Sequence, residues 1–327
     1  MFRAMLCKDY SGPQGLALGE LPREPLGDDD VRVAVHVAGV GFADILVTQG
    51  QYQLKPPTPF APGGECAGEV LDVGPAVKYV APGDRVMCGR AVGAFAEEIV
   101  VQEKHVTRLP DGVAYTQAAA LRSAYGTGYY ALQHRGHLQP GEVLLVHAAA
   151  GAVGLAAVDL GRMMGARVIG TVGSDEKAAA VRAAGVEHVI NYRRTPRLRD
   201  EVKALTADRG ADVIYDPVGG DLFDESLRCI AWGGRLLVIG FASGRIPSAP
   251  ANLALVKNMS IVGVYFGSWV DHEPLRLRAH YEQILQWCAA GRITPHISSV
   301  RPLEQAGQAL LDLAARQVVG KVVLQVR

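Results

Sequence analysis

A run of small residues at positions 149–154 has the composition of a loop that can bind a phosphate group. An apolar stretch at 143–146, typical of a buried strand, precedes it, and a helix-like segment and a second apolar stretch at 167–170 follow it. This order forms a dinucleotide-binding unit, because small residues let the backbone approach a pyrophosphate and the helix N-terminus offers N–H groups to it. The first glycine of the usual G-x-G-x-x-G pattern is an alanine here. We predict that a dinucleotide binds along Ala149, Gly151, Ala152, Val153 and Gly154.

The residues after the second apolar stretch indicate which dinucleotide binds. An acidic residue at that point would bind the 2′-hydroxyl of an NAD ribose, but Val-Gly-Ser stands at 172–174 and Lys177 follows one helical turn later. A 2′-phosphate needs a cation and N–H donors without a competing carboxylate, so the segment favours NADP(H). Asp175 and Glu176 are the evidence against this interpretation. We interpret them as solvent-facing acids in the first turn of a helix; the alternative is that one of them binds the ribose.

The composition is that of an enzyme with a large core. Among 327 residues, 33 Lys and Arg balance 33 Asp and Glu, so we expect neither nucleic acid nor an anionic membrane as a partner. The N-terminus lacks the apolar core of a signal peptide. The longest nearly uncharged run, 143–158, is short for a membrane span. Five scattered cysteines without a C-x-x-C pair are typical of reduced thiols, and we expect a cytoplasmic protein.

Near residue 142 the sequence changes from a β-rich pattern to an alternation of strands and helices, which predicts an α/β protein with two domains. Residues 1–124 are expected to form a β-rich catalytic domain, 125–266 a doubly wound parallel sheet of six strands, and 267–327 a segment that returns to the first domain. Outside the dinucleotide unit, strands are predicted at 31–40, 68–73, 85–88, 188–191, 211–215, 235–239, 260–264 and 318–326, and helices from 116, at 274–290 and at 303–315.

Motifs spread over nearly the whole chain resemble the medium-chain dehydrogenase/reductase superfamily, within its zinc-free quinone oxidoreductase (ζ-crystallin-like) branch. The matching segments are 39–44, 62–68, 83–86, 125–130, 149–154, 191–192, 216–220 and 320–323. The resemblance implies a GroES-like catalytic domain joined to a Rossmann cofactor domain.

The departures from the zinc-containing relatives are as informative as the matches. Alcohol dehydrogenases of the superfamily carry a cysteine where Gly41 stands, a histidine where Gly64 stands and a third ligand near Ser123. The four-cysteine lobe of a structural zinc site is also missing, and Cys88 stands alone there. Because zinc needs three or four N, S or O ligands on one centre, we predict no catalytic metal.

The resemblance also implies roles for individual residues and makes NADPH the expected cofactor. Gly173, Ser174, Lys177 and Tyr192 match the positions that hold the 2′-phosphate in this branch. Around the nicotinamide end it suggests Thr127, Tyr130, Val218, Phe241 and Ala242, with core packing as the alternative role, above all for Tyr130. Arg316 either reaches the cofactor or only caps the predicted helix 303–315.

Without a Lewis acid or a recognisable nucleophile system, the chemistry reduces to aligning a hydride donor with an acceptor that is already electrophilic. Quinones and activated alkenes meet this condition. Phe42, Asp44 and Tyr52 are the candidates for the edge of the substrate pocket, and Tyr52 either donates a hydrogen bond to a quinone oxygen or only shapes the pocket. The sequence identifies no proton donor.

Three functions follow, in order of preference. The first is an NADPH-dependent quinone reductase; the second is an NADPH-dependent reductase of α,β-unsaturated carbonyl or acyl compounds; the third is a weakly catalytic, ζ-crystallin-like NADPH-binding protein. The resemblance further implies a homodimer in which the strand at 260–264 pairs with its copy, because an open apolar edge strand invites aggregation.

Overall fold

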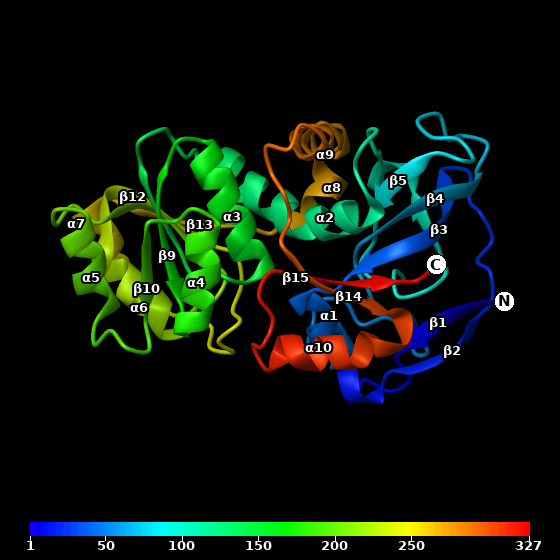
Figure 1. Cartoon of the computed structure of the whole chain (residues 1–327), viewed down its shortest axis with the longest axis horizontal. Helices are drawn as coiled ribbons and strands as arrows, with labels where there is room; N and C mark the ends of the chain where they lie inside the picture. The colour runs from blue at the N-terminus through cyan, green and yellow to red at the C-terminus, as the bar shows by residue number, and fades with distance from the viewer. The chain divides into compact units, whose positions relative to one another are not determined.

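The computed structural model describes the backbone of all 327 residues and every side chain except that of Val270. The chain divides into two compact units. Unit 1 comprises Met1–Ser123 and Ser268–Arg327, and unit 2 comprises Ala124–Gly267. Unit 1 is discontinuous because strand β15 (Lys321–Gln325), close to the C-terminus, pairs antiparallel with β3 (Asp30–Gly39) (Figure 1).

Strand β3 organises unit 1. Val31, Val33 and Val35, at alternate positions of this strand, are fully buried in the core of unit 1. The strand pairs with β4, β6 and β15. The resulting seven-stranded sheet runs β14–β15–β3–β4–β5–β7, with β6 paired to β3, and β1 and β2 form a separate two-stranded sheet. The remaining strands are β1 (Phe2–Leu6), β2 (Ala17–Leu21), β4 (Cys66–Val73), β5 (Arg85–Cys88), β6 (Glu98–Gln102), β7 (Val106–Arg108) and β14 (Ile297–Pro302).

Helices close the apolar face of this sheet. Residues from α10, together with Val322 and Leu324 of β15, enter the same core as the valines of β3. The first part of the longest N-terminal helix, α2, also belongs to unit 1, and its last residues belong to unit 2. The helices are α1 (Phe42–Thr48), α2 (Tyr115–Tyr129), α8 (Trp269–His272), α9 (Pro274–Ala289) and α10 (Ala306–Ala314).

Unit 2 is a doubly wound sheet, as the sequence predicts. Its six strands are all parallel, in the order β10–β9–β8–β11–β12–β13. The order reverses between β8 and β11, and in such sheets ligands bind outside the carboxyl ends of the strands at this reversal. The strands are β8 (Val143–Val146), β9 (Arg167–Val172), β10 (His188–Asn191), β11 (Ala211–Asp216), β12 (Ile230–Val238) and β13 (Ser260–Gly263).

Helices cover both faces of this sheet: α3 and α4 lie on one face, and α5, α6 and α7 lie on the other (Figure 1). Right-handed crossovers from parallel strands produce this arrangement. The helices are α3 (Ala152–Met163), α4 (Asp175–Ala183), α5 (Leu198–Leu205), α6 (Gly220–Cys229) and α7 (Ala251–Lys257).

The structure departs from the predicted elements at several ends. Strand β12 starts at Ile230, five residues before the predicted start, and its pairing with β11 shifts register between Ile230 and Arg235, where Gly233 has a left-handed backbone, φ 75°. The predicted helix 303–315 is a short 3₁₀ turn followed by α10. After α2 the chain continues as a π-helix, Tyr130–Arg135, an irregularity that often marks functional positions.

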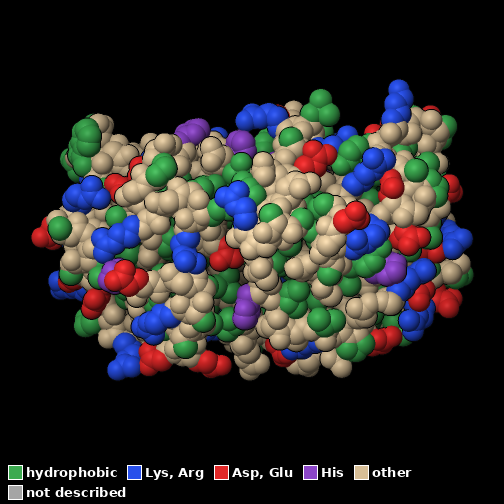
Figure 2. Space-filling model, turned by 45° about the horizontal axis from the view of Figure 1, so that its top comes forward, with side chains coloured by type: hydrophobic (Ala, Val, Ile, Leu, Met, Phe, Trp, Pro, Cys, Tyr) green, Lys and Arg blue, Asp and Glu red, His purple; other side chains and the backbone are tan. Residues whose placement is uncertain are grey.

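The surface carries mixed charge. Basic and acidic side chains are interspersed over the face that Figure 2 shows, as expected for equal numbers of the two. Among the described residues, no helix has both the length and the apolar character needed to cross a lipid bilayer.

Candidate functional site

The turn between β8 and α3 has the geometry of a phosphate-binding loop. The Gly151 amide donates to the Ala148 carbonyl at 2.9 Å, and Ala148 has a left-handed backbone, φ 48°. A Cβ at Gly154 would lie 2.2 Å from the carbonyl oxygen of Ala148, so only glycine fits there. A Cβ at Gly151 would meet nothing closer than 3.4 Å. Glycine at 154 therefore packs the helix against the strand, and glycine at 151 leaves the backbone open to a ligand.

The first turn of α3 offers free donors. The amide of Leu155 is the first to bond back to the turn, donating to the Gly151 carbonyl at 2.8 Å. No side chain caps the helix, and the amides of Ala152, Val153 and Gly154 donate to no protein acceptor among the described residues. Unpaired N–H groups at a helix start bind anions. The structure thus brings together all five residues that the sequence assigns to the pyrophosphate.

The end of β9 forms a second group of predicted residues. The Ser174 hydroxyl caps α4 by accepting a hydrogen bond from the Lys177 amide at 3.3 Å. A Cβ at Gly173 would lie 2.7 Å from the Tyr192 hydroxyl and 3.7 Å from Nε of Arg193. Tyr192 and Arg193 therefore lie over the backbone at the tip of β9. The sequence identified Tyr192 through resemblance but gave no signal for Arg193.

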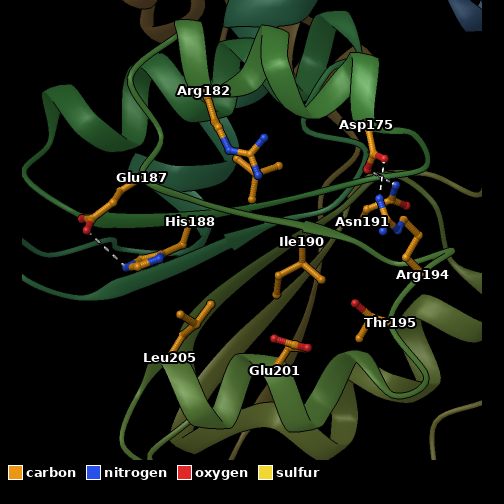
Figure 3. A pocket seen from close by; sticks show the side chains of 11 residues that line it. Asp175, Arg182, Glu187, His188, Ile190, Asn191, Arg194, Thr195, Glu201 and Leu205 are labelled. Atoms are coloured by element: carbon orange, nitrogen blue, oxygen red, sulfur yellow. Dashed lines mark hydrogen bonds and ion pairs between the residues drawn. The ribbon is translucent and has the colours of Figure 1, made fainter.

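Asp175 is largely exposed, as the sequence suggested, and its carboxylate also has two partners. One carboxylate oxygen accepts a hydrogen bond from the Asn191 amide at 2.8 Å, and the other pairs with the Arg194 guanidinium at 2.7 Å. Figure 3 shows this group at one end of a pocket of about 410 Å³, which residues of α4, β10, α5 and the loop before α5 line. The turn at 149–154 does not line this pocket.

A third loop joins residues that resemblance assigned to the nicotinamide end. The Asp216 carboxylate accepts hydrogen bonds from the amides of Val218 at 2.8 Å and Gly219 at 2.9 Å. The Ala242 amide donates to Pro217 at 3.1 Å, and the ring of Phe241 lies against Gly219. Val218, Phe241 and Ala242 are thus brought together.

Thr127, in α2, and Tyr130, the first residue of the π-helix that follows, are both half-buried. The Tyr130 ring lies 5.8 Å from the ring of Phe266. Tyr130 therefore packs against a neighbouring aromatic side chain, as its alternative role requires, while keeping part of its surface accessible.

His147, which the sequence did not single out, anchors the base of the phosphate turn. Its two ring nitrogens lie 2.9 Å from the Thr171 hydroxyl and 2.7 Å from the Ser226 hydroxyl. Burial lowers the pKa of this imidazole, so it stays neutral and both hydroxyls keep a partner. The contacts tie β8, β9 and α6 together just before the turn.

In unit 1 a buried ion pair lies beside Gly41, Gly64 and Ser123, the positions at which the zinc-containing relatives carry metal ligands. Lys321 of β15 donates to one carboxylate oxygen of Glu65 at 2.5 Å, and the Ser123 amide donates to the other at 2.7 Å. Both charged residues are almost fully buried, with 4% and 3% of their surfaces exposed. The Glu65 carbonyl also accepts the Gly39 amide at 3.0 Å. One glutamate thus joins three separate segments of the chain.

A second, half-buried cation fixes the neighbouring backbone. The Arg122 guanidinium donates to the carbonyls of Gly64 at 3.2 Å and Gly89 at 3.0 Å, and it lies over the Tyr281 ring at 5.6 Å. Burial raises the pKa of Tyr281 to about 12, so this phenol stays protonated beside the guanidinium. The sequence gave no signal for Arg122, whose partners are all distant in the chain.

Zinc does not fit these residues. A Cβ at Gly41 would stand 3.9 Å from the Lys321 ammonium, which would repel a metal ion, and neither Gly41 nor Gly64 offers a ligand atom. Among the side chains that the structure describes, no group of three or more His, Cys, Asp or Glu residues is placed to hold a metal ion.

Asp44 is the buried member of the predicted substrate-pocket residues. Its carboxylate accepts the Gly41 amide at 2.8 Å, and it is 5% exposed. Burial raises the pKa of Asp44 to about 7, while the Gly41 hydrogen bond and the Lys321 ammonium oppose this shift. A Cβ at Gly64 would lie 4.0 Å from this carboxylate. The two glycines therefore leave open space against the Asp44 carboxyl group.

The other two pocket candidates differ in exposure. Phe42, at the start of α1, is 41% exposed. Tyr52 packs its half-buried ring against a small cluster that includes Cys7, Val47 and Phe60. Arg316 is exposed and lies just beyond α10 with a left-handed backbone, and its amide donates to Leu313 at 3.0 Å.

Comparisons with known proteins agree with this architecture. Sequence models of the alcohol dehydrogenase GroES-like domain and of zinc-binding dehydrogenases match residues 27–111 and 152–290. The whole chain is 43% identical to quinone oxidoreductase-like protein 2 of Mus musculus, of which it covers 93%. Over 96% of its length it is 36% identical to a quinone oxidoreductase of Pseudomonas aeruginosa, of which it covers 97%. The Escherichia coli quinone oxidoreductase complexed with NADPH superposes with a TM-score of 0.93 at 29% identity, over 99% of this chain and 100% of that one.

We predict that the ion pair in unit 1 stabilises the fold only as a pair. Lys321→Met leaves the Glu65 carboxylate buried without its cation, which costs about 3–5 kcal/mol. The double variant Lys321→Met/Glu65→Gln also removes the unpaired carboxylate charge, and it should regain at least half of the lost free energy of unfolding. Urea denaturation followed by circular dichroism measures both. As a control, Arg245→Met breaks exposed ion pairs and should leave the midpoint unchanged. A loss from Lys321→Met no larger than that from the control would contradict the prediction.

The two glycines of the phosphate turn should respond differently to the same added methyl group. Gly154→Ala forces a Cβ into the Ala148 carbonyl and should destabilise the protein by roughly 1–3 kcal/mol. Gly151→Ala meets only the Ala148 carbonyl oxygen, at 3.4 Å, so the stability of this variant should hardly change, whereas dinucleotide binding should weaken because the methyl group occupies the ligand's approach. Thermal unfolding and a fluorescence titration with NADPH separate the two effects. Equal melting temperatures for both variants would show that the helix does not pack as described.

Proposed function

Because the chain belongs to the quinone oxidoreductase branch of the medium-chain dehydrogenase/reductase superfamily, we propose that it is an NADPH-dependent quinone reductase that works without a metal ion. We take unit 1 as the catalytic domain and unit 2 as the cofactor-binding domain. The observation that carries the proposal is the Glu65–Lys321 pair, whose ammonium lies near Gly41, where the metal-dependent relatives carry a ligand.

The donors in unit 2 support NADPH as the cofactor. Free amides at the start of α3 suit a pyrophosphate. At the end of β9, Ser174, Lys177 and Tyr192 provide hydroxyl groups and a cation for a 2′-phosphate. The nearest acid, Asp175, is engaged with Asn191 and Arg194 and so does not compete for the ribose. Thr127, Tyr130, Val218, Phe241 and Ala242 would hold the nicotinamide end, and Arg316 is a further candidate.

The residues around Gly41 limit the acceptor. When bound, NADPH supplies a hydride from its nicotinamide ring. Gly41 and Gly64 carry no ligand atom, and no set of metal ligands stands among the side chains that the structure describes, so the proposal requires an acceptor that is electrophilic already. A quinone satisfies this requirement: transfer of the hydride would leave the hydroquinone monoanion, and one proton from solvent would complete the hydroquinone. Phe42, Asp44 and Tyr52 would line the acceptor's site, with the exposed face of Phe42 suited to stacking on a flat ring.

NADPH oxidation with two panels of acceptors tests the proposal. Quinones should support turnover, and acrylates and enones should not. Turnover only with the alkenes would favour reduction of α,β-unsaturated carbonyl compounds, and NADPH binding without oxidation in either panel would favour a weakly catalytic binding protein.

Metal independence is tested separately. Activity should survive prolonged chelation, and elemental analysis should find well under one zinc ion per chain, because Gly41, Gly64 and Ser123 supply no side-chain set for zinc. Stoichiometric zinc, with activity lost when the zinc is removed and regained when it is returned, would contradict this part of the proposal.

Lys177 should set much of the preference for NADPH over NADH. A hydrogen bond to a charged group contributes roughly 1.5–3 kcal/mol, and partial exposure favours the lower end of that range. Lys177→Ala should therefore weaken NADPH binding about tenfold, while NADH binding should stay nearly unchanged. The rate at saturating NADPH should also hold, because this contact contributes equally to ground and transition states. If both cofactors weaken alike, Lys177 has a structural role instead.

We also propose a homodimer formed through β13. This edge strand pairs only with β12 and exposes Ile261, which leaves an apolar strand open to a partner. Sedimentation velocity at micromolar concentration should detect a dimer, and Ile261→Asp should yield monomers by placing a charge in the joined sheet. A monomeric unmodified protein would contradict the proposal.

A further inference from the structure

Two consecutive arginines follow Tyr192 in the loop between β10 and α5, and they lie in different surroundings. The Arg194 guanidinium is committed to the Asp175 carboxylate at 2.7 Å, a contact visible in Figure 3. The Arg193 guanidinium, by contrast, makes no hydrogen bond or ion pair with any residue that the structure describes. An unpaired cation beside a paired one suggests a different task for each.

Arg193 is held at its backbone, and its exposed side chain passes near the tip of β9. Its amide donates to the Asn191 side-chain oxygen at 3.1 Å, while the other end of that side chain donates to Asp175. Its Nε lies 3.7 Å from the point where a Cβ of Gly173 would stand. The side chain thus extends over the tip of β9 beside the Tyr192 hydroxyl, which would lie 2.7 Å from the same point.

We propose that Arg193 is a second cation for the 2′-phosphate of NADPH and that Arg194 holds Asp175 away from that phosphate. The inference rests on the proposed cofactor. A 2′-phosphate is a compact anion that an arginine fork can bind through two N–H groups, which a lysine cannot do. Lys177 on α4 and Arg193 on the loop after β10 would approach it from different elements. Asp175, left without Arg194, would add a carboxylate beside the phosphate and oppose binding.

Binding of two small nucleotides tests the inference without any catalytic readout. Adenosine 2′,5′-bisphosphate carries the 2′-phosphate and adenosine 5′-monophosphate lacks it, and isothermal titration of both gives a ratio of affinities for each variant. Arg193→Gln should lower the affinity for the bisphosphate about tenfold, the effect expected from the loss of one hydrogen bond to a charged group. The affinity for the monophosphate should change by less than about twofold, since this nucleotide has no 2′-phosphate to contact. Arg197→Gln removes an equal charge from the same loop and serves as the control. It should change neither affinity.

The role of Arg194 is separated by a double variant. Arg194→Gln should lower the affinity for the bisphosphate, because the Asp175 carboxylate loses its cation. The double variant Arg194→Gln/Asp175→Asn should regain the affinity, because a neutral amide then replaces that carboxylate. If the double variant stays as weak as Arg194→Gln, Arg194 contacts the phosphate directly and the proposed division is overturned. If Arg193→Gln binds like the Arg197→Gln control, Arg193 is not a ligand. An unmodified protein that binds both nucleotides equally would instead overturn the proposed preference for NADPH.

Discussion

The buried pair of Glu65 and Lys321 is the constraint on which unit 1 depends. Removing two charges from water is costly, and here the cost is offset because each carboxylate oxygen has a donor, the Lys321 ammonium for one and the Ser123 amide for the other. The pair depends on the return of the chain: Lys321 belongs to β15, which pairs with β3 and buries Val322 and Leu324 in the same core. Apolar burial and strand pairing therefore hold the ammonium beside Glu65.

The same pair fixes the charge beside Gly41. The Lys321 ammonium would lie 3.9 Å from a Cβ at that position, so a cation placed there would meet a fixed positive charge. The ion pair of Asp175 and Arg194 in unit 2 is of a different kind, since both side chains are largely exposed and water screens their attraction.

Features that depend on residues close together in the sequence could be predicted from it. The strand at 143–146 was predicted with its observed ends, because a fully buried parallel strand is a continuous apolar run between polar residues. The six-stranded parallel sheet followed from the alternation of strands and helices. The start of β12 was missed because Gly233 and Gly234 look like a turn, and the shift of register at Gly233 interrupts the alternation that marks a strand.

The parts of the site that escaped prediction depend on contacts between distant residues. Asp175 resembled a solvent-facing helix acid, and its partner Arg194 lies nineteen positions away. His147 could be placed at the end of a strand but not between the hydroxyls of Thr171 and Ser226. A sequence pattern shows which residue types stand at an element's end, whereas the charge state of a site depends on which side chains meet there. Asp175 shows this difference: its place in the first turn of α4 can be read from the sequence, whereas its contacts with Asn191 and Arg194 exist only in the folded chain.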